Sequence, residues 1–184
     1  AWTFDQGDCA TNGISTVRAS ATPSGGTPIA AEAPCEDGKV DLGEVGAGSF
    51  AISAEAIDAD GVVRAETYGI SATFGEGGPF TDLDVTLYPK ASNVTVNWNG
   101  CPTGFIIPYY ITIYNPPAEV GGELVDDVER IQETCTPGSV TIPNVAPGDY
   151  IVELESISQQ PYIQGTTELT VVAGEDTEVT IDVP

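Results

Sequence analysis

The sequence predicts an all-β protein made of two tandem antiparallel β-sandwich domains. The first observation is a repeat, because residues 35–57 align with residues 135–157 without a gap. A match of this length at one fixed offset is typical of a duplicated structural unit. The identical pairs are Cys35 and Cys135, Gly38 and Gly138, Val40 and Val140, Val45 and Val145, Gly48 and Gly148, Glu55 and Glu155, and Ile57 and Ile157.

Composition is the second observation. The chain of 184 residues contains 21 Gly and 14 Pro, is 41% hydrophobic and is only 18% charged. Together with the many Val, Ile and Thr residues, this favours short strands and turns over helices. About seven short runs per unit, with turn signals roughly every 8–12 residues, are typical of a β-sandwich. We therefore place the two domains at residues 1–89 and 90–184.

Alternating apolar residues and turn signals place the strands of the first domain. Its first strand contains Trp2 and lacks the beginning that the sequence NVTVN provides ahead of Trp98 in the second domain. The remaining strands are expected from residue 14 onward and at residues 40–42, 50–54, 62–70 and 82–87, with a loop at 71–80.

The second domain follows the same order with two departures. Residues 104–117 form an aromatic insertion, and the segment at 120–132 is longer than its counterpart, with one helical turn expected at 126–131. The final strand is expected at residues 178–183. Its Val-Thr-Ile sequence, 179–181, matches Val-Thr-Leu at 85–87 of the first domain.

Four cysteines fall two to each domain: Cys9 and Cys35, then Cys101 and Cys135. No CxxC pair and no histidine are present, so a zinc site would need an unusual set of ligands. One disulfide per domain is the simpler interpretation, and of the three pairings we expect Cys9–Cys35 and Cys101–Cys135. Disulfides indicate an oxidising, extracellular or periplasmic compartment.

The charge balance excludes several functions. There are 28 acidic residues against 5 basic ones, giving a net charge of −23, and no histidine. So few Lys and Arg exclude nucleic acid and disfavour an anionic membrane as a partner. Without histidine, Ser–His and Cys–His catalysis is excluded, and we expect no enzyme. The scattered carboxylates predict a solvated surface first, with cation binding, basic partners or a high-salt habitat as alternatives.

A turn with the sequence Asp-Ala-Asp-Gly is the one candidate metal site. Asp58 and Asp60, with Glu66 as a further ligand, could form a weak calcium site. The pattern lacks the later glutamate of an EF-hand, so a plain turn is the favoured interpretation and no cofactor is expected otherwise.

The aromatic insertion is the candidate binding surface. Phe105, Tyr109, Tyr110 and Tyr114 lie close together in the sequence. Alternation along a strand places some of them in the core, and the others could form a surface patch for a glycan or protein partner.

The repeated block carries a resemblance to known families. The pattern V-x-[LI]-x-x-V-x-x-G-x-[FY]-x-[IV], which begins at Val40, resembles the carboxypeptidase-regulatory-like and Cna-B-like families. The longer segment WTFDQGDCATNGISTVRASATP is similar to tandem modules of bacterial surface lipoproteins. The resemblance implies an Ig-like or prealbumin-like sandwich at the cell surface and no catalytic residues. Some Cna-B-like domains contain a Lys–Asn crosslink; Lys39 lies in the block but the final strands contain no Asn, so we predict none here.

These observations together predict a non-enzymatic extracellular structural or adhesive module, a cell-surface spacer or stalk. The alternative is a subunit of an extracellular filament, a homopolymer in which a strand from one copy completes the first domain of another. An accessory domain of an exported enzyme is a third interpretation. No apolar run approaches the ~20 residues of a membrane span, and no signal peptide is recognised.

Overall fold

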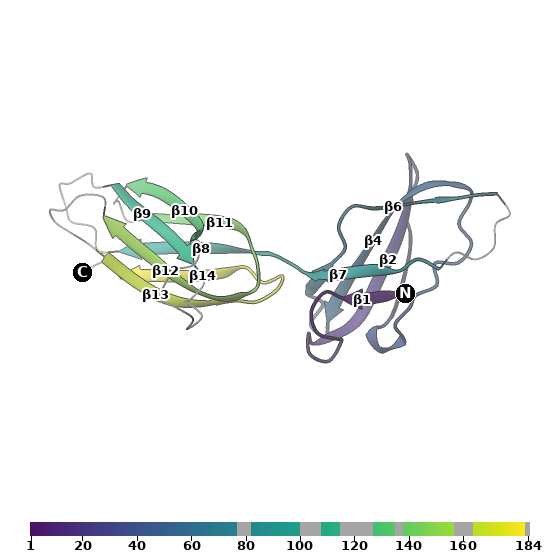
Figure 1. Ribbon diagram of the computed structural model, residues 1–184, viewed down its shortest axis with the longest axis horizontal. Coiled ribbons are helices and arrows are strands. Elements are labelled where there is room, and N and C mark those ends of the chain that lie inside the picture. The colour runs from purple at the N-terminus through teal and green to yellow at the C-terminus, as the bar shows by residue number, and fades with distance from the viewer. Residues whose placement is uncertain (77–81, 100–107, 115–126, 135–137, 157–163, 183–184) are drawn as a thin grey trace, which may run out of the picture. The chain divides into compact units, whose positions relative to one another are not determined.

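The computed structural model describes residues 1–76, 82–99, 108–114, 127–134, 138–156 and 164–182. The chain divides into two compact units, Ala1–Lys90 and Ala91–Pro184, a boundary one residue from the one placed by sequence (Figure 1). Strands dominate both units, which confirms the all-β prediction. No helix among the described residues is long and apolar enough to cross a membrane.

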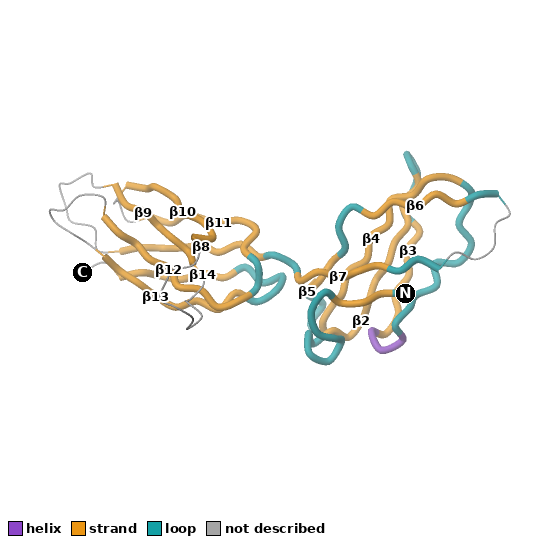
Figure 2. Tube along the Cα trace, viewed as in Figure 1, coloured by secondary structure: helices purple, strands orange, loops and turns teal. Residues whose placement is uncertain are grey.

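Unit 1 contains one sheet path in the order β1-β7-β5-β4-β2-β3, with β6 paired to β4 (Figure 2). β4 pairs with β6 along its first half and with β5 along its second half. The elements are β1 (Trp2–Phe4), β2 (Ile14–Pro23), β3 (Ile29–Pro34), a 3₁₀ turn η1 (Cys35–Asp37), β4 (Gly48–Asp58), β5 (Val63–Glu66), β6 (Ile70–Phe74) and β7 (Val85–Pro89).

Small residues line the centre of unit 1. Along β2 and β4, Ala19 lies opposite Ala54 and Ala21 opposite Ile52, all with buried side chains. Alanine at these positions leaves room for a large residue from the other layer. Trp2 of β1 supplies it, because it belongs to the same buried cluster as Ala19 and Ala54. The short pair β1–β7 therefore packs across the β2–β4 face.

Unit 2 is a β-sandwich of two sheets, one ordered β10-β9-β12-β13 and the other β11-β8-β14. Alternate residues of both sheets meet in one core that includes Trp98, Ile111, Ile142 and Leu154, as facing sheets require. The strands are β8 (Ser92–Asn99), β9 (Pro108–Tyr114), β10 (Asp127–Thr134), β11 (Gly138–Val145), β12 (Gly148–Ser156), β13 (Gln164–Val171) and β14 (Thr177–Asp182).

Two local predictions are wrong. A helical turn is expected at 126–131, but residues 127–131 belong to β10, which pairs antiparallel with β9 from Asp127 onward. The loop expected at 71–80 begins with β6, which pairs with the start of β4 through Ile70 and Phe74. In both cases a neighbouring strand supplies partners for the backbone, and tertiary pairing overrides a weak local preference.

The strand expected at residues 40–42 is also absent. Its counterpart in unit 2, β11, pairs antiparallel with β8 along most of its length. In unit 1, the chain from Gly38 to Gly46 has no strand geometry, although Val40, Leu42 and Val45 still contribute half-buried side chains to the core. A strand needs a neighbour for its backbone groups, and no described strand pairs with this segment.

Pairing also corrects the alignment of the final strands. Trp98 lies beside Ile181 in the parallel pair β8–β14, and Trp2 lies beside Val85 in the parallel pair β1–β7. Val85 therefore takes the place of Ile181, two residues from the match suggested by sequence. A shift of two residues keeps the same face of a strand inward, so alternation alone does not distinguish the two alignments.

Candidate functional site

The first strand of each unit has different described partners. In unit 2, β8 lies between β11 and β14 and pairs with both over most of its length. In unit 1, β1 pairs with β7 through three residues only, Trp2 to Phe4.

The chain from Lys39 to Ala47 has no strand partner among the described residues. None of these residues makes a backbone–backbone hydrogen bond to another described residue; the nearest such bond is from the Trp2 N–H to the Gly38 carbonyl, at 3.3 Å. The Gly43 N–H is satisfied locally by the Asp41 carboxylate. The segment therefore presents backbone donors and acceptors that its counterpart β11 commits to β8.

A groove of about 1660 Å³ lies at this position, within unit 1. The groove is lined by residues of β2 and β4, including Ala21 and Ile52, and by the segment from Lys39 to Ala47. Trp2 and residues that precede β7, including Leu83, also line it.

The rim of the groove is strongly acidic. Two ammonium groups, those of Lys39 and of the Ala1 amino terminus, are found among the described residues that line it. The carboxylates that line it are those of Glu32, Asp37, Asp41, Glu44, Glu76 and Asp82. Like charges repel, so the rim disfavours an acidic ligand and favours a neutral or basic one.

The Asp58 turn is organised as a turn and not as a cluster of metal ligands. Asp58 Oδ1 accepts hydrogen bonds from the N–H groups of Asp60 and Val62, each at 2.9 Å. Its Oδ2 lies 2.6 Å from Arg64 Nη2, and Glu66 lies 3.8 Å from Lys90 instead. Within the described part of the chain, no three acidic, Cys or His side chains gather as a metal site.

The pKa of Asp58 follows from these contacts. The hydrogen bond from the Val62 N–H has the largest effect on the pKa of this carboxyl and lowers it. Desolvation opposes this effect, but the hydrogen bonds from Arg64 and from the Asp60 N–H lower the pKa further, so it lies below its usual value. Asp58 is therefore ionised throughout the physiological range.

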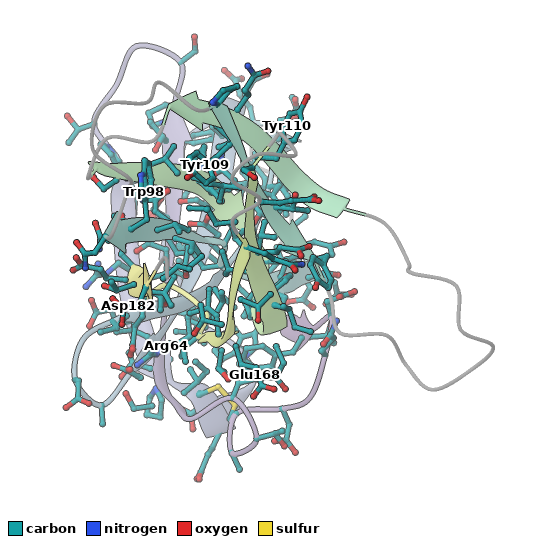
Figure 3. All side chains as sticks on the ribbon, turned by 90° about the vertical axis from the view of Figure 1, so that its left-hand side faces the viewer. Arg64, Trp98, Tyr109, Tyr110, Glu168 and Asp182 are labelled. Carbon is teal, nitrogen blue, oxygen red and sulfur yellow. A yellow bond between two sulfur atoms is a disulfide. The ribbon has the colours of Figure 1, made fainter. Side chains whose placement is uncertain are left out.

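The aromatic residues do not form one surface patch. Tyr109 is only 1% exposed and belongs to the core of unit 2, so it is excluded from the candidate binding surface. Tyr110, labelled beside Tyr109 in Figure 3, belongs to the other face of β9. Tyr110 and Tyr114 are both half-buried. Phe105 lies outside the described residues. Period-two alternation along β9 explains this separation.

The disulfide Cys9–Cys35 is present, with the two Cα atoms 5.9 Å apart, which confirms this pairing. It ties the segment after β1 to the 3₁₀ turn η1, next to the wall of the groove. Cys101 and Cys135 lie outside the described residues, so the second pairing stays a prediction.

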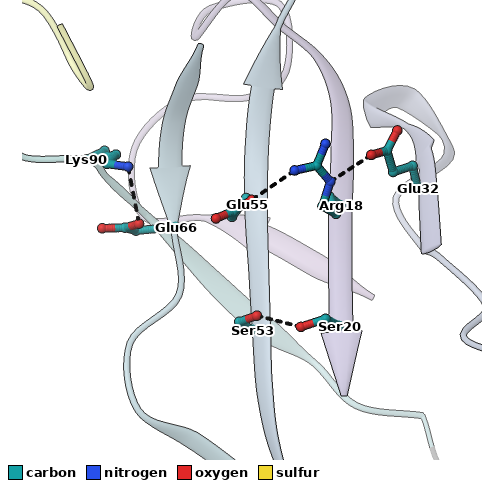
Figure 4. Close-up of polar contacts among 7 residues, drawn as sticks. All are labelled: Arg18, Ser20, Glu32, Ser53, Glu55, Glu66 and Lys90. Atoms are coloured by element: carbon teal, nitrogen blue, oxygen red, sulfur yellow. Dashed lines mark hydrogen bonds and ion pairs between the residues drawn. The ribbon is translucent and has the colours of Figure 1, made fainter. Parts of the chain in front are cut away.

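Glu55, which is identical to Glu155 at the equivalent position of the other repeat, takes part in an ion-pair network on the outer face of unit 1. Arg18 lies between two carboxylates, with Nε 2.7 Å from Glu32 and Nη1 3.5 Å from Glu55 (Figure 4). The three side chains come from adjacent strands β2, β3 and β4, directly across from one another. Half-exposed pairs of this kind contribute little to stability, and they indicate no binding site.

Sequence reasoning does not identify the groove. The loss of strand structure at residues 39–47 follows only from the three-dimensional pairing. Ala21 and Ile52, which line the groove, are ordinary core positions in the sequence.

Comparisons with known proteins leave the family open. No protein-family model matches the chain, and no curated protein matches it. Among solved structures, the major pilin of Streptococcus pyogenes is 10% identical, with 99% of this chain and 95% of the pilin covered and a TM-score of 0.33. A candidate cell adhesion protein from Bacteroides ovatus is 9% identical, with coverage of 94% and 85% and a TM-score of 0.35. One from Bacteroides fragilis is 12% identical, with coverage of 91% and 79% and a TM-score of 0.34. Scores in this range assign neither a family nor a function.

Proposed function

We propose that the chain is a non-enzymatic structural or adhesive module of the cell surface, a spacer or stalk that carries tension along the polypeptide. The observation that supports this is the pairing of the first and last strands of each unit. β8 and β14 run parallel and adjacent, with six residue pairs from Val94 beside Thr177 to Asn99 beside Asp182.

Parallel pairing matters because of the direction in which tension acts. Force applied through the two ends of a unit pulls the first strand toward its own beginning and the last strand toward its own end. Two parallel neighbours then slide along each other, and all their hydrogen bonds are strained together instead of opening one at a time. β1 and β7 have the same arrangement over three residue pairs.

Two further features agree with a spacer. Only Lys90 and Ala91 separate β7 from β8, which is too short for a flexible tether. The disulfide Cys9–Cys35 fits an oxidising compartment outside the cytosol.

The mechanical part of this proposal is tested by stretching single molecules from both ends. We expect two unfolding events, with the higher force belonging to unit 2 because it has more paired residues in its terminal strands. The Cys9–Cys35 bond locks a span of 26 residues, so reduction should lengthen the extension of unit 1 by about 90 Å. Unfolding of unit 2 at a force no higher than that of unit 1 would contradict the shear argument.

The location is tested with antibodies raised against the purified chain. We expect them to label intact source cells without permeabilisation. Labelling that needs permeabilised cells would contradict a surface role.

A second candidate function is a subunit of an extracellular filament, and the observation that favours it is the backbone of residues 39–47, which makes no backbone–backbone hydrogen bond to a described residue. In such a filament, a strand from one copy would fill the groove of the next. Light scattering and electron microscopy over a wide concentration range test this candidate. Particles that grow with concentration support it, and a monomer at every concentration contradicts it.

A further inference from the structure

Two tyrosine side chains lie side by side on the outer face of unit 1. Leu87 of β7 is fully buried, so the next residue, Tyr88, faces the other way, and its side chain is 40% exposed. Tyr68 follows β5 and is 57% exposed. The two ring centres are 5.7 Å apart, and the ring planes meet at 32°. Two phenol rings that contact each other are therefore both open to solvent.

The backbone holds both rings at this separation. Tyr88 lies opposite Glu66 in the antiparallel pair β5–β7, and Tyr68 is two residues beyond Glu66. Residues in this diagonal relation across a strand pair are within reach of each other's long side chains. Thr67 fixes the chain just before Tyr68, because its N–H donates to the Ala54 carbonyl at 3.0 Å and its hydroxyl accepts the Ala54 N–H, also at 3.0 Å. Paired backbone on both sides thus positions the two tyrosines.

The composition of the chain directs surface oxidation to these tyrosines. Methionine and free cysteine are common targets of oxidants. The chain contains no Met and no His, and Cys9 and Cys35 form a disulfide. Trp2 and Trp98 are only 9% and 4% exposed. Among the described residues, the most exposed aromatic rings that an oxidant meets are those of Tyr68 and Tyr88.

We propose that Tyr68 and Tyr88 form an oxidative cross-linking site, at which a haem peroxidase acting with hydrogen peroxide joins the two rings by a carbon–carbon bond. Each phenol gives up one electron and its hydroxyl proton and becomes a phenoxyl radical, whose unpaired electron is shared with the ring carbons beside the C–O bond. One such carbon from each ring forms the new bond. Each of these carbons then loses its hydrogen as a proton, and each oxygen regains a proton. The rings lose two hydrogen atoms in all, and one hydrogen peroxide takes up two electrons and two protons to become two water molecules.

Contact between the rings favours this bond over coupling between separate chains. Reacting groups that are held together on one molecule behave as if at a very high concentration, so two radicals on the same chain meet first. The exposure of both rings admits the oxidant and leaves room for the rings to turn until the two carbons meet. The compartment also fits, because the disulfide Cys9–Cys35 indicates an oxidising one.

The cross-link ties β7 to the connection between β5 and β6. The backbones of β5 and β7 are joined by two residue pairs, Ala65 beside Pro89 and Glu66 beside Tyr88. The new bond adds a covalent link beside them and closes a span of 20 residues, from 68 to 88. Under force, the extension of unit 1 should therefore be shorter by about 70 Å. The cross-link itself does not depend on the mechanical role proposed above, whereas this consequence deepens that role.

The test treats the full 184-residue chain with a haem peroxidase and hydrogen peroxide and then maps its peptides. Trypsin releases residues 65–90 as one peptide, because no Lys or Arg lies between Arg64 and Lys90. A second protease, which cuts after glutamate, divides this peptide after Glu76 and so separates Tyr68 from Tyr88. The pieces 67–76 and 77–90 come apart without the cross-link. With it, they stay joined and weigh two hydrogen atoms less than the two pieces together.

We expect the joined pieces, together with the blue fluorescence of coupled tyrosine, at a yield per chain that does not change on dilution. Tyr68→Phe and Tyr88→Phe should each abolish the joined pieces and lower the fluorescence, because phenylalanine has no hydroxyl hydrogen to give up. Both variants keep the exposed ring, so the fold should be unchanged. Tyr110→Phe, at a half-buried tyrosine of unit 2, is the matched control and should leave the joined pieces unaffected.

Three results would overturn the inference. The first is complete separation of the two pieces after a treatment that couples free N-acetyltyrosine in the same vessel. The second is joined pieces that persist in Tyr68→Phe or Tyr88→Phe. The third is a product in which chains are joined to one another in place of the internal bond. If the internal bond forms while antibodies label only permeabilised cells, the cross-linking site stands and the surface role fails.

Discussion

Asp58 and Arg64 form a closed ion pair at the connection between β4 and β5, with Asp58 Oδ2 2.6 Å from Arg64 Nη2. The Asp58 side chain is only 10% exposed, and its other oxygen accepts two backbone N–H groups of the same turn. Both carboxylate oxygens are therefore occupied by donors from the protein. A calcium ion at this turn would have to displace Arg64.

The first prediction follows from this arrangement. We expect millimolar calcium to leave the melting temperature of the chain unchanged. The variant Asp58→Ala should melt several degrees lower with or without calcium, because the turn loses its acceptor and Arg64 loses its partner. Asp60→Ala, in the same turn but with an exposed side chain, is the matched control and should melt like the parent. A calcium-dependent rise in melting temperature that Asp58→Ala abolishes would restore the calcium interpretation.

The second prediction concerns pH. The folded protein holds the pKa of Asp58 below the reference value of 3.8, chiefly through the Val62 N–H. A carboxyl with a lowered pKa stabilises the folded state at pH values above its unfolded pKa, and this contribution is lost as the pH falls through the folded pKa. Urea midpoints of the parent and of Asp58→Asn should therefore differ at pH 6 and converge below pH 3.8. A difference that stays constant down to pH 2 would refute this account.

The third prediction concerns the disulfide Cys9–Cys35. Replacing both cysteines with alanine should lower the free energy of unfolding of unit 1 by about 3–4 kcal/mol, since the bond closes a long loop in the unfolded chain. The loss is measured by urea denaturation, with the emission of Trp2 in a Trp98→Phe background as the probe. Unit 2 should be unaffected, and its unfolding provides the internal control. Equal losses in both units would contradict the placement of this bond.

The fourth prediction concerns Tyr150 in β12. Its hydroxyl donates a hydrogen bond to the Ala146 carbonyl at 2.8 Å, and burial raises its pKa, so it remains a donor. Tyr150→Phe should cost about 1 kcal/mol of unfolding free energy in unit 2, as expected for one hydrogen bond. The repeat supplies a natural comparison, because unit 1 already has Phe50 at this position. An unchanged stability would show that water replaces the bond without cost.

Local patterns anticipate much of this structure where side-chain alternation is strong. The strand at residues 50–54, with Phe50 and Ile52 inward, is present in β4, as alternation requires. The pairing Cys9–Cys35 is likewise anticipated, from two cysteines and the repeat. Predictions fail where the local sequence is compatible with both a helix and a strand. Residues 127–131 are an example, because they form a strand through their pairing with β9.

The candidate site residues were likewise predicted only in part from the sequence. Tyr109 and Tyr110 differ in burial because neighbouring residues of a strand face opposite sides, but which of the two faces the core is decided by the opposing sheet. Asp58 and Glu66 are close in the sequence, yet each binds a different cation, Arg64 or Lys90.

The sequence by itself determined the duplicated unit, the all-β class, one disulfide pairing and the turns, because these depend on residue type and spacing along the chain. The tertiary structure alone decided that residues 39–47 remain without a strand partner while their counterparts form β11. The physical reason is that a β-strand is stabilised by hydrogen bonds to a neighbour distant in the sequence. Val40 and Leu42 have the right pattern for a strand, and what they lack is a second backbone alongside.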